Sequence, residues 1–533
     1  MRIALAQINT TIGDFDGNVR RIREAAQGRD ASVVLFPELA ICGYMPRDLL
    51  RQPSFLDACE QALDRLAADR GLPPIVVGAP VRAEGPGKPL LNAAVLIRDG
   101  ERVVVAKRLL PTYDVFDERR YFRPGDSVGP VELDGTRVGF TVCEDIWLGE
   151  TYPGDPVADL VAAGAEAILN ISASPFLRGK PEARREVARG HARRHGVPVA
   201  LCNLIGANDQ LVFDGNSFAF DGRGHLAGHA PGFEECVLEV DLSVASGLPV
   251  PAPDPVEEVR DAIVVGIRDY LAKTGFRQAM LGMSGGIDSS LVACLAADAL
   301  GAENVIGVAM PGPFSANHSL EDARELAARL GIRFLDVPIR AAYERLLEDL
   351  RPVWGEDKKF GLAEENLQAR LRGTVLMTLS NHNGALVLVP SNKSEFAMGY
   401  ATLYGDMVGA LGPIADLYKG QVYELSRRCY EMPARILERA PSAELRPDQT
   451  DQDSLPPYEV LDEILRLHLE ERRRPTEIVE AGFDDETVRF VLRCVARSEY
   501  KRQQGAPVLK LTPKAFGLGR RVPITERFKG GVH

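Results

Sequence analysis

The first half of the chain is a succession of short apolar runs rich in β-branched residues, which predict β-strands. Helical periodicity separates some of these runs, at 55–69 and 182–195, and turns such as Arg98-Asp99-Gly100 join others, as in a hairpin. Mixed α/β structure with both βαβ units and hairpins is therefore expected. The predicted strands are 3–8, 32–36, 75–78, 93–97, 103–106, 138–142 and 197–202.

The second half alternates more regularly between apolar runs and helical segments. Such alternation favours a doubly wound parallel sheet, in which ligands bind at the carboxyl ends of the strands. After Tyr418 the pattern is helical and then gives way to a basic, proline-containing tail. The predicted strands are 278–281, 305–310, 334–338 and 385–389, and the predicted helices are 290–300, 319–330 and 365–381.

Alternating prolines between positions 249 and 255 divide the chain into comparable halves. Because proline cannot continue a helix or an inner strand, this segment is expected to be a stiff linker. The length of 533 residues allows two to four domains. The predicted organisation is a first domain at 1–245, a linker at 246–256 and a second domain at 257–533.

Composition narrows the class of protein. The net charge of −12 argues against a general nucleic-acid binder, and no apolar run reaches the length of a membrane span. The N-terminus becomes polar too early for a signal peptide. The eight cysteines form no CxxC pair, so a disulfide framework or a structural zinc site is not expected. We therefore expect a cytoplasmic protein, and the net charge does not argue against a small anionic ligand, which needs only local positive groups.

A glycine- and serine-rich turn lies between the predicted strand 278–281 and the predicted helix 290–300. This arrangement presents backbone N–H groups to a phosphate, although no GK[ST] closes the turn as in a Walker A loop. A carboxylate inside such a turn repels the anion unless a cation bridges them, so Asp288 predicts a bound Mg²⁺. An ordinary glycine-rich turn is the simpler alternative. The residues concerned are Gly282, Met283, Ser284, Gly285, Gly286, Ile287, Asp288 and Ser289.

Three predicted strands of the first half end next to a chemically suited residue. Glu38 follows 32–36, Lys107 follows 103–106 and Cys143 follows 138–142. Side chains at strand ends can converge on one pocket, where a thiolate would attack an amide, a carboxylate would carry the proton and an amine would stabilise the oxyanion. Taken singly, each residue is as well explained as a surface charge or a core cysteine.

The extended segments around these residues resemble the nitrilase superfamily and, more narrowly, the glutaminase domain of the glutamine-dependent NAD synthetases. They read FPELAICGY, KRLLPTYDVFDERRYF and VCEDIW. The resemblance implies an αββα sandwich with Glu38 as general base, Lys107 as oxyanion group and Cys143 as nucleophile. It also implies a second catalytic glutamate, Glu118. The implied glutamine-binding residues are Tyr44, Tyr113, Ser174 and Lys180.

The second half resembles the synthetase domain of the same family, and its turn resembles the SGGxDS loop of the N-type ATP pyrophosphatases. The signatures ENLQAR and NKSE imply deamido-NAD contacts at Asn366, Arg370 and Glu395, with Glu395 also a Mg²⁺ ligand beside Asp288. Where the family usually has threonine before this second signature, the chain has Pro390, which offers neither a hydroxyl nor an N–H. Further implied contacts are Lys419 and Ser442 to ATP, together with the aligned Pro390, and Lys501 to deamido-NAD.

Together these matches cover nearly the whole chain and imply one reaction. Ammonia released from L-glutamine would amidate deamido-NAD at the expense of ATP, giving NAD, AMP, pyrophosphate and glutamate. Two alternatives are an ATP-dependent amidotransferase with a different acceptor and a non-catalytic binding protein that kept the fold. The resemblance also implies a homo-oligomer built from dimers, up to an octamer. Because ammonia released at the first site must reach the second before it takes up a proton, we also expect an enclosed passage between the two sites.

Overall fold

The computed structural model describes residues 1–147, 152, 154–244, 247–354, 359–447 and 449–528. The chain forms two compact units, Met1–Glu258 and Val259–His533. The predicted boundary at 245–246 lies outside the described residues. Helix α5 (Pro255–Thr274) begins at the last proline of the predicted linker, so the alternating prolines end where a regular helix begins.

The first unit contains two six-stranded sheets, each with parallel strands at its centre. One sheet has the order β14-β1-β2-β3-β4-β5, with β14 (Cys236–Asp241), β1 (Arg2–Gln7), β2 (Val33–Leu35), β3 (Ile75–Arg82), β4 (Leu90–Arg98) and β5 (Glu101–Ala106). The other has the order β13-β12-β9-β8-β7-β6, with β13 (Leu226–His229), β12 (Phe218–Phe220), β9 (Val199–Asn203), β8 (Ala167–Ser172), β7 (Thr136–Val142) and β6 (Val131–Leu133). A separate hairpin joins β10 (Ile205–Asn208) to β11 (Leu211–Asp214).

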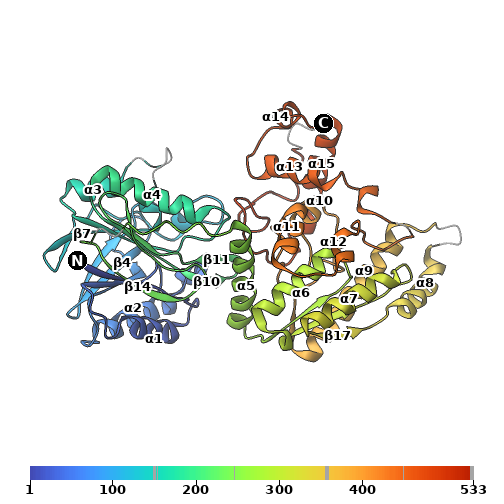
Figure 1. Ribbon diagram of the computed structural model, residues 1–533, viewed down its shortest axis with the longest axis horizontal. Coiled ribbons are helices and arrows are strands. Elements are labelled where there is room, and N and C mark those ends of the chain that lie inside the picture. The colour runs from blue at the N-terminus through green and yellow to red at the C-terminus, as the bar shows by residue number, and fades with distance from the viewer. Residues whose placement is uncertain (148–151, 153, 245–246, 355–358, 448, 529–533) are drawn as a thin grey trace. The chain divides into compact units, whose positions relative to one another are not determined.

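Helices cover the outer faces of these two sheets. Helices α1 (Phe15–Ala26) and α2 (Pro53–Ala67) lie on one side, and α3 (Pro156–Ala162) and α4 (Lys180–His195) lie on the other (Figure 1). Alternate residues of β1 serve different layers, since Ile3 and Leu5 pack between the sheets whereas Ala4 and Ala6 pack toward α1 and α2. This period of two produces the predicted αββα sandwich.

The second unit is built on a four-stranded parallel sheet of order β17-β16-β15-β18. Its strands are β15 (Gln278–Gly282), β16 (Val305–Ala309), β17 (Arg333–Asp336) and β18 (Ala385–Val387), so the predicted strands at 334–338 and 385–389 run two residues too far. The helices connected with these strands are α6 (Ile287–Leu300), α7 (Asn317–Leu330), α8 (Arg340–Trp354) and α9 (Leu362–Asn383). The doubly wound parallel sheet is therefore as predicted.

A helical region with its own hydrophobic cluster follows the sheet. It contains α10 (Lys393–Met398), α11 (Lys419–Cys429), α12 (Ala434–Glu438), α13 (Tyr458–Leu469), α14 (Pro475–Glu480), α15 (Asp485–Arg497) and α16 (Glu499–Arg502). Among the described helices, none combines the length and hydropathy that crossing a membrane requires.

The final segment of the chain is tied to this helical region by a buried lysine. Lys393 Nζ contacts Asp416 Oδ1 at 3.0 Å and Thr512 Oγ1 at 2.6 Å. Asp416 also accepts hydrogen bonds from the backbone N–H groups of Leu511 and Thr512. Removing one partner of such a buried ion pair costs about 3–5 kcal/mol. The segment around Thr512 is therefore an integral part of the second unit.

Candidate active sites

The three residues of the predicted glutaminase site come from the ends of neighbouring elements. Glu38 lies three residues beyond β2, and Lys107 directly follows β5. Cys143 directly follows β7 and opens the short 3₁₀ helix η3 (Cys143–Ile146). The sandwich fold therefore brings together residues that are far apart in sequence, because strands of both sheets end at this place.

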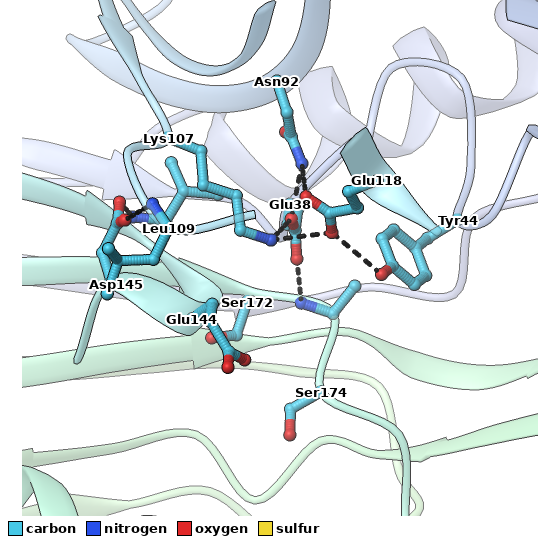
Figure 2. A network of polar contacts seen from close by, with 12 residues as sticks. Glu38, Tyr44, Asn92, Lys107, Leu109, Glu118, Glu144, Asp145, Ser172 and Ser174 are labelled. Atoms are coloured by element: carbon cyan, nitrogen blue, oxygen red, sulfur yellow. Dashed lines mark hydrogen bonds and ion pairs between the residues drawn. The ribbon is translucent and has the colours of Figure 1, made fainter. Parts of the chain in front are cut away.

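Lys107 lies between two carboxylates and is completely buried. Its Nζ is 2.7 Å from Glu38 Oε1 and 2.8 Å from Glu118 Oε1. Figure 2 shows both carboxylates directed at the ammonium, with Asn92 reaching them from the other side. Asn92 Nδ2 donates to Glu38 Oε1 at 2.7 Å, and the backbone N–H of Ala173 donates to Glu38 Oε2 at 3.1 Å. The position of the Glu38 carboxylate is thus fixed by three donors.

The charges in this network determine the proton positions. Burial would lower the pKa of Lys107, but Glu118 and Glu38 raise it well above its ordinary value, so the amine stays charged. Burial raises the pKa of Glu118 to about 7, although Lys107 opposes this shift. Burial, reinforced by Glu38, also raises the pKa of the Cys143 thiol, against the opposing effect of Lys107. The resting nucleophile is therefore a protonated thiol that needs a base.

The turn that carries Cys143 is held by the carboxylate of Asp145. Cys143 has a φ of 45°, a left-handed conformation that is costly for a residue with a Cβ. Asp145 Oδ2 accepts from the N–H of Val142 at 3.0 Å, and Asp145 Oδ1 accepts from the N–H groups of Arg108 and Leu109 at 3.0 and 2.8 Å. One carboxylate thus connects the cysteine turn to the segment directly after Lys107 (Figure 2).

The predicted glutamine-binding residues occupy different surroundings. Tyr44 is buried and its hydroxyl donates to Glu118 at 3.2 Å, so it is part of the ion network. Tyr113 is exposed and its hydroxyl donates to Glu144, which directly follows Cys143. Lys180 Nζ lies 4.4 Å from the centre of the Trp147 ring, directly after η3. Ser174 is buried, and its backbone N–H donates to Asn203 at 2.9 Å.

Three residues of this site were not predicted from the sequence. Asn92 bridges Glu38 and Glu118, Glu144 binds Tyr113, and Asp145 holds the cysteine turn. Asn92 is a lone amide in β4, where every other residue before the terminal Arg98 is apolar, and this is the signal that could have identified it. Glu144 and Asp145 stand next to Cys143 in the sequence and could have been found by asking what orients the nucleophile.

The glycine-rich turn of the second unit runs from the end of β15 into the first turn of α6. Gly285 has a φ of 77°, and a Cβ placed on it would lie 2.2 Å from the carbonyl oxygen of Ser319. The turn is also organised by its own hydroxyl groups, because Ser284 Oγ accepts from the N–H of Gly286 and contacts Ser289 Oγ, both at 3.2 Å. A residue with a side chain at position 285 could not preserve this conformation.

Two carboxylates converge on one lysine beside this turn. Lys419 Nζ lies 2.6 Å from Asp288 Oδ2 and 3.1 Å from Glu395 Oε1. Asp288 Oδ1 also accepts from Asn392 Nδ2 at 3.0 Å. Burial raises the pKa of Glu395 to about 7, with Lys419 opposing the shift and Asp288 adding to it. A set of oxygen donors next to a turn predicted to bind phosphate suits Mg²⁺, so these residues fit the predicted metal.

The three remaining predicted deamido-NAD contacts surround one loop, residues 399–403. Asn366 Oδ1 accepts from Thr402 Oγ1 at 2.7 Å, and Arg370 Nε donates to the carbonyl of Leu403 at 3.2 Å. Lys501 Nζ donates to the carbonyl oxygens of Gly399 and Ala401, both at 2.7 Å. The fold thus brings together side chains that lie up to 135 positions apart in the sequence.

The remaining predicted ATP contacts lie in connecting segments. Pro390 stands between β18 and α10 and supplies no N–H, while the adjacent Ser391 is buried. Ser442 Oγ accepts from the N–H of Glu444 at 3.1 Å. Glu444 in turn accepts from the N–H of Ala316 at 3.2 Å and from the hydroxyl of Ser319, whose carbonyl lies against Gly285. The segment of Ser442 is thus linked to the phosphate turn.

Comparisons with known proteins match both units. The carbon-nitrogen hydrolase family matches residues 2–249 and the NAD synthase family matches residues 259–505. The chain is 45% identical to the glutamine-dependent NAD(+) synthetase of Synechocystis and 42% identical to that of Thermotoga maritima, each over 99% of both chains. The structure of glutamine-dependent NAD+ synthetase from Acinetobacter baumannii in complex with ADP shares 37% identity and a TM-score of 0.77 over 98% of both chains. This chain therefore belongs to the glutamine-dependent NAD(+) synthetase family.

Proposed function

We propose that the first unit releases ammonia from L-glutamine and that the second unit uses this ammonia to convert deamido-NAD to NAD at the expense of ATP. The observation that carries the proposal is the Glu38–Lys107–Glu118 network, because it supplies a base and a fixed positive charge near a buried thiol. Membership of the family supports the same reaction. The roles of individual residues follow from their positions and charges.

In the first unit, Glu38 removes the proton of the Cys143 thiol. The thiolate then attacks the carboxamide carbon of glutamine, and Lys107 stabilises the negative charge on the carbonyl oxygen. Collapse of this intermediate breaks the C–N bond, and Glu38 returns its proton to the leaving ammonia. Water hydrolyses the remaining thioester to glutamate and regenerates the thiol. The raised pKa of Cys143 explains why the adjacent base is required.

Glu118 and Asn92 act on this reaction by positioning. Glu118 contacts Lys107 and Asn92 contacts Glu38, so they hold the ammonium and the carboxylate in place relative to the turn of Cys143. Tyr113 contacts Glu144 within η3, and Lys180 contacts Trp147 directly after η3. The Lys180 ammonium suits the α-carboxylate of an amino-acid substrate, and the Tyr113 hydroxyl can accept a hydrogen bond from its α-ammonium.

In the second unit, the nicotinate carboxylate of deamido-NAD attacks the α-phosphorus of ATP, which gives an adenylate and pyrophosphate. Ammonia then attacks the activated carbonyl and AMP leaves. The N–H groups of residues 284–289 bind phosphate oxygens. Asp288 and Glu395 would hold Mg²⁺, which when bound neutralises charge between the phosphates. Lys419 already contacts both carboxylates and lies where a phosphate oxygen would gain a hydrogen bond.

The acceptor site is assigned to the loop at 399–403. Asn366, Arg370 and Lys501 place amide, guanidinium and ammonium groups around it, and cations suit a dinucleotide pyrophosphate. Leu403 carries no charge of its own, but Arg370 at its carbonyl oxygen brings a cation to this position. A cytoplasmic location and a homo-oligomer built from dimers, up to an octamer, complete the proposal.

The test is product analysis with isotopically labelled glutamine. Incubation with deamido-NAD, ATP, Mg²⁺ and amide-¹⁵N glutamine is expected to give NAD with the label in its carboxamide group, together with AMP and pyrophosphate. Omission of deamido-NAD should abolish AMP formation. AMP formation with another acceptor and none with deamido-NAD would reject the assigned acceptor.

A further inference from the structure

Two histidines of α4 face an aspartate at the start of α3, behind the turn that carries Cys143. His191 and His195 are four residues apart on one helix, and their rings stack with centroids 5.9 Å apart and an angle of 14° between planes. Potential ligand atoms of Asp155, His191 and His195 all lie within 4.8 Å of one another. Two histidines at i and i+4 on one helix face are a recurring arrangement for binding Zn²⁺.

The tautomer of His191 leaves one ring nitrogen with an unpaired lone pair. His191 Nε2 lies 2.8 Å from the carbonyl oxygen of Ile146, so this nitrogen must carry the proton. Nδ1 is then an acceptor, yet it is buried and has no hydrogen-bond partner among the described residues. An imidazole that donates from one nitrogen to a backbone carbonyl and ligates through the other is typical of metal-bound histidine.

The other two members offer further ligands. His195 Nε2 is likewise buried and without a hydrogen-bond partner among the described residues. Asp155 accepts from the N–H of Ala158 at 3.0 Å and lies 3.6 Å from Arg194 Nη1, so its carboxylate retains coordination sites. The Arg194 side chain is 56% exposed and can turn toward solvent when a cation takes its place.

We propose that Asp155, His191 and His195 bind a divalent transition cation of the Zn²⁺ class. Two imidazole nitrogens and one carboxylate oxygen suit Zn²⁺ better than Mg²⁺ or Ca²⁺, which prefer oxygen ligands alone. The cation joins the start of α3 to the end of α4, and His191 connects it through Ile146 to η3, whose first residue is Cys143. The site is therefore a brace behind the glutaminase turn and takes no part in the amidation reaction.

The test is zinc binding by the full-length protein after removal of metals by a chelator, with competition against a chromophoric chelator. The wild type is expected to bind one Zn²⁺ per chain at this site. Asp155→Asn, which keeps an acceptor for the N–H of Ala158, and His195→Ala should each weaken binding roughly 100-fold. His225→Ala is the matched control, because this histidine lies in the same unit but is 54% exposed and outside the cluster.

Two further measurements keep the proposal falsifiable. Cys143→Ala should retain the site, and Co²⁺ in place of Zn²⁺ should give no thiolate charge-transfer absorption, because no cysteine is a ligand. Zn²⁺ should raise the Tm of the wild type and of His225→Ala but not of His195→Ala. The proposal is overturned if the wild type binds no Zn²⁺, if Asp155→Asn and His195→Ala bind it as tightly as the control, or if Cys143→Ala abolishes binding.

Discussion

Each unit places a buried lysine between two carboxylates, but the two arrangements differ in their access to solvent. In the first unit, the side chains of Lys107, Glu38 and Glu118 are 0%, 0% and 4% exposed. In the second, Lys419 is 2% exposed, whereas Asp288 and Glu395 are 17% and 18% exposed. Burial raises the pKa of one glutamate in each triad, Glu118 and Glu395, to about 7.

This difference separates a site that is complete in the protein alone from one that a ligand completes. Asn92, Tyr44 and Ala173 supply additional donors to the carboxylates beside Lys107, so its charges are already matched. The carboxylates beside Lys419 keep exposed surface next to the glycine-rich turn that we propose binds phosphate, where a metal–nucleotide complex could share them. The first site is preorganised for covalent chemistry, and the second is preorganised for binding.

The largest expected effect comes from removing the nucleophile. Cys143→Ala should lower glutamine-dependent NAD formation by on the order of 10⁴-fold or more, because the covalent step is lost. NAD formation from ammonium should continue, since the second unit is unchanged. Rates with each nitrogen source test this, and Cys236→Ala, at a half-buried cysteine of β14, is the control. An equal loss with both sources would contradict the division of labour.

The second-largest effect is expected at the partly exposed triad of the second unit, formed by Lys419, Asp288 and Glu395. Asp288→Asn should lower NAD formation roughly 10²–10³-fold with either nitrogen source, because it removes the negative charge that would hold Mg²⁺ against the phosphates of ATP. Glutamine hydrolysis should be much less affected. Asp298→Asn, on the same helix α6, serves as the control, because its carboxylate accepts from Tyr430 away from the turn. Normal synthesis by Asp288→Asn would refute the metal assignment.

A third effect concerns the pH dependence of magnesium binding. Because Glu395 has a pKa of about 7 and must lose its proton to ligate, apparent Mg²⁺ affinity should rise about tenfold between pH 6 and pH 8. Glu395→Gln should bind Mg²⁺ weakly at both values. Ammonium-dependent synthesis titrated with Mg²⁺ at fixed ATP provides the measurement. A wild-type affinity independent of pH would show that Glu395 is not a ligand.

The smallest effect is expected on the free energy of unfolding, through Glu118 in the buried triad of the first unit. The folded-state pKa of Glu118, about 7, lies above its ordinary value of 4.5, so the folded state binds the proton more tightly. Its contribution to the free energy of unfolding is present in full below pH 4.5 and is lost as pH rises to about 7. Between these values the loss is at most about 1.4 kcal/mol per pH unit, and Glu118→Gln should remove it.

The two tryptophans of the chain allow this measurement in one unit. Trp147 belongs to the first unit and Trp354 to the second. In a Trp354→Phe background, fluorescence during urea unfolding therefore reports the first unit, with and without Glu118→Gln, from pH 5 to pH 8. The same slope with pH in both proteins would indicate that Glu118 does not titrate in this range.

Sequence patterns predicted the fold well because the layers impose strict periodicity. The apolar run of β1 led to the observed strand, and the turn at Asp99 and Gly100, two residues with positive φ, led to the β4–β5 hairpin. The predicted strands include none for β6, β8 or β10 to β14. β8 is an inner strand that is buried at every position, so it shows no alternation of buried and exposed residues, whereas β14 lies at a sheet edge, where half-buried positions weaken the apolar signal.

Residues with reactive groups could be proposed as site residues from the sequence, whereas residues that hold others in place could not. Glu38, Lys107 and Cys143 stand at strand ends in recognisable segments, whereas Asn92 acts across the sheet on residues 54 and 26 positions away. Such a contact depends on register between distant strands, which local sequence does not contain. Lys393 illustrates the same limit, because lysine side chains are mostly exposed in proteins and the structure buries this one completely.

The buried Lys393 also has a genetic consequence. Every residue assigned to catalysis or substrate binding lies at or before position 501, so a stop codon just upstream of Leu511 would leave each of them in place. It would nevertheless strip Asp416 of two backbone N–H donors and Lys393 of the Thr512 hydroxyl. A late nonsense allele should therefore behave as a null allele, because its product misfolds and is degraded although every assigned catalytic and binding residue is still encoded.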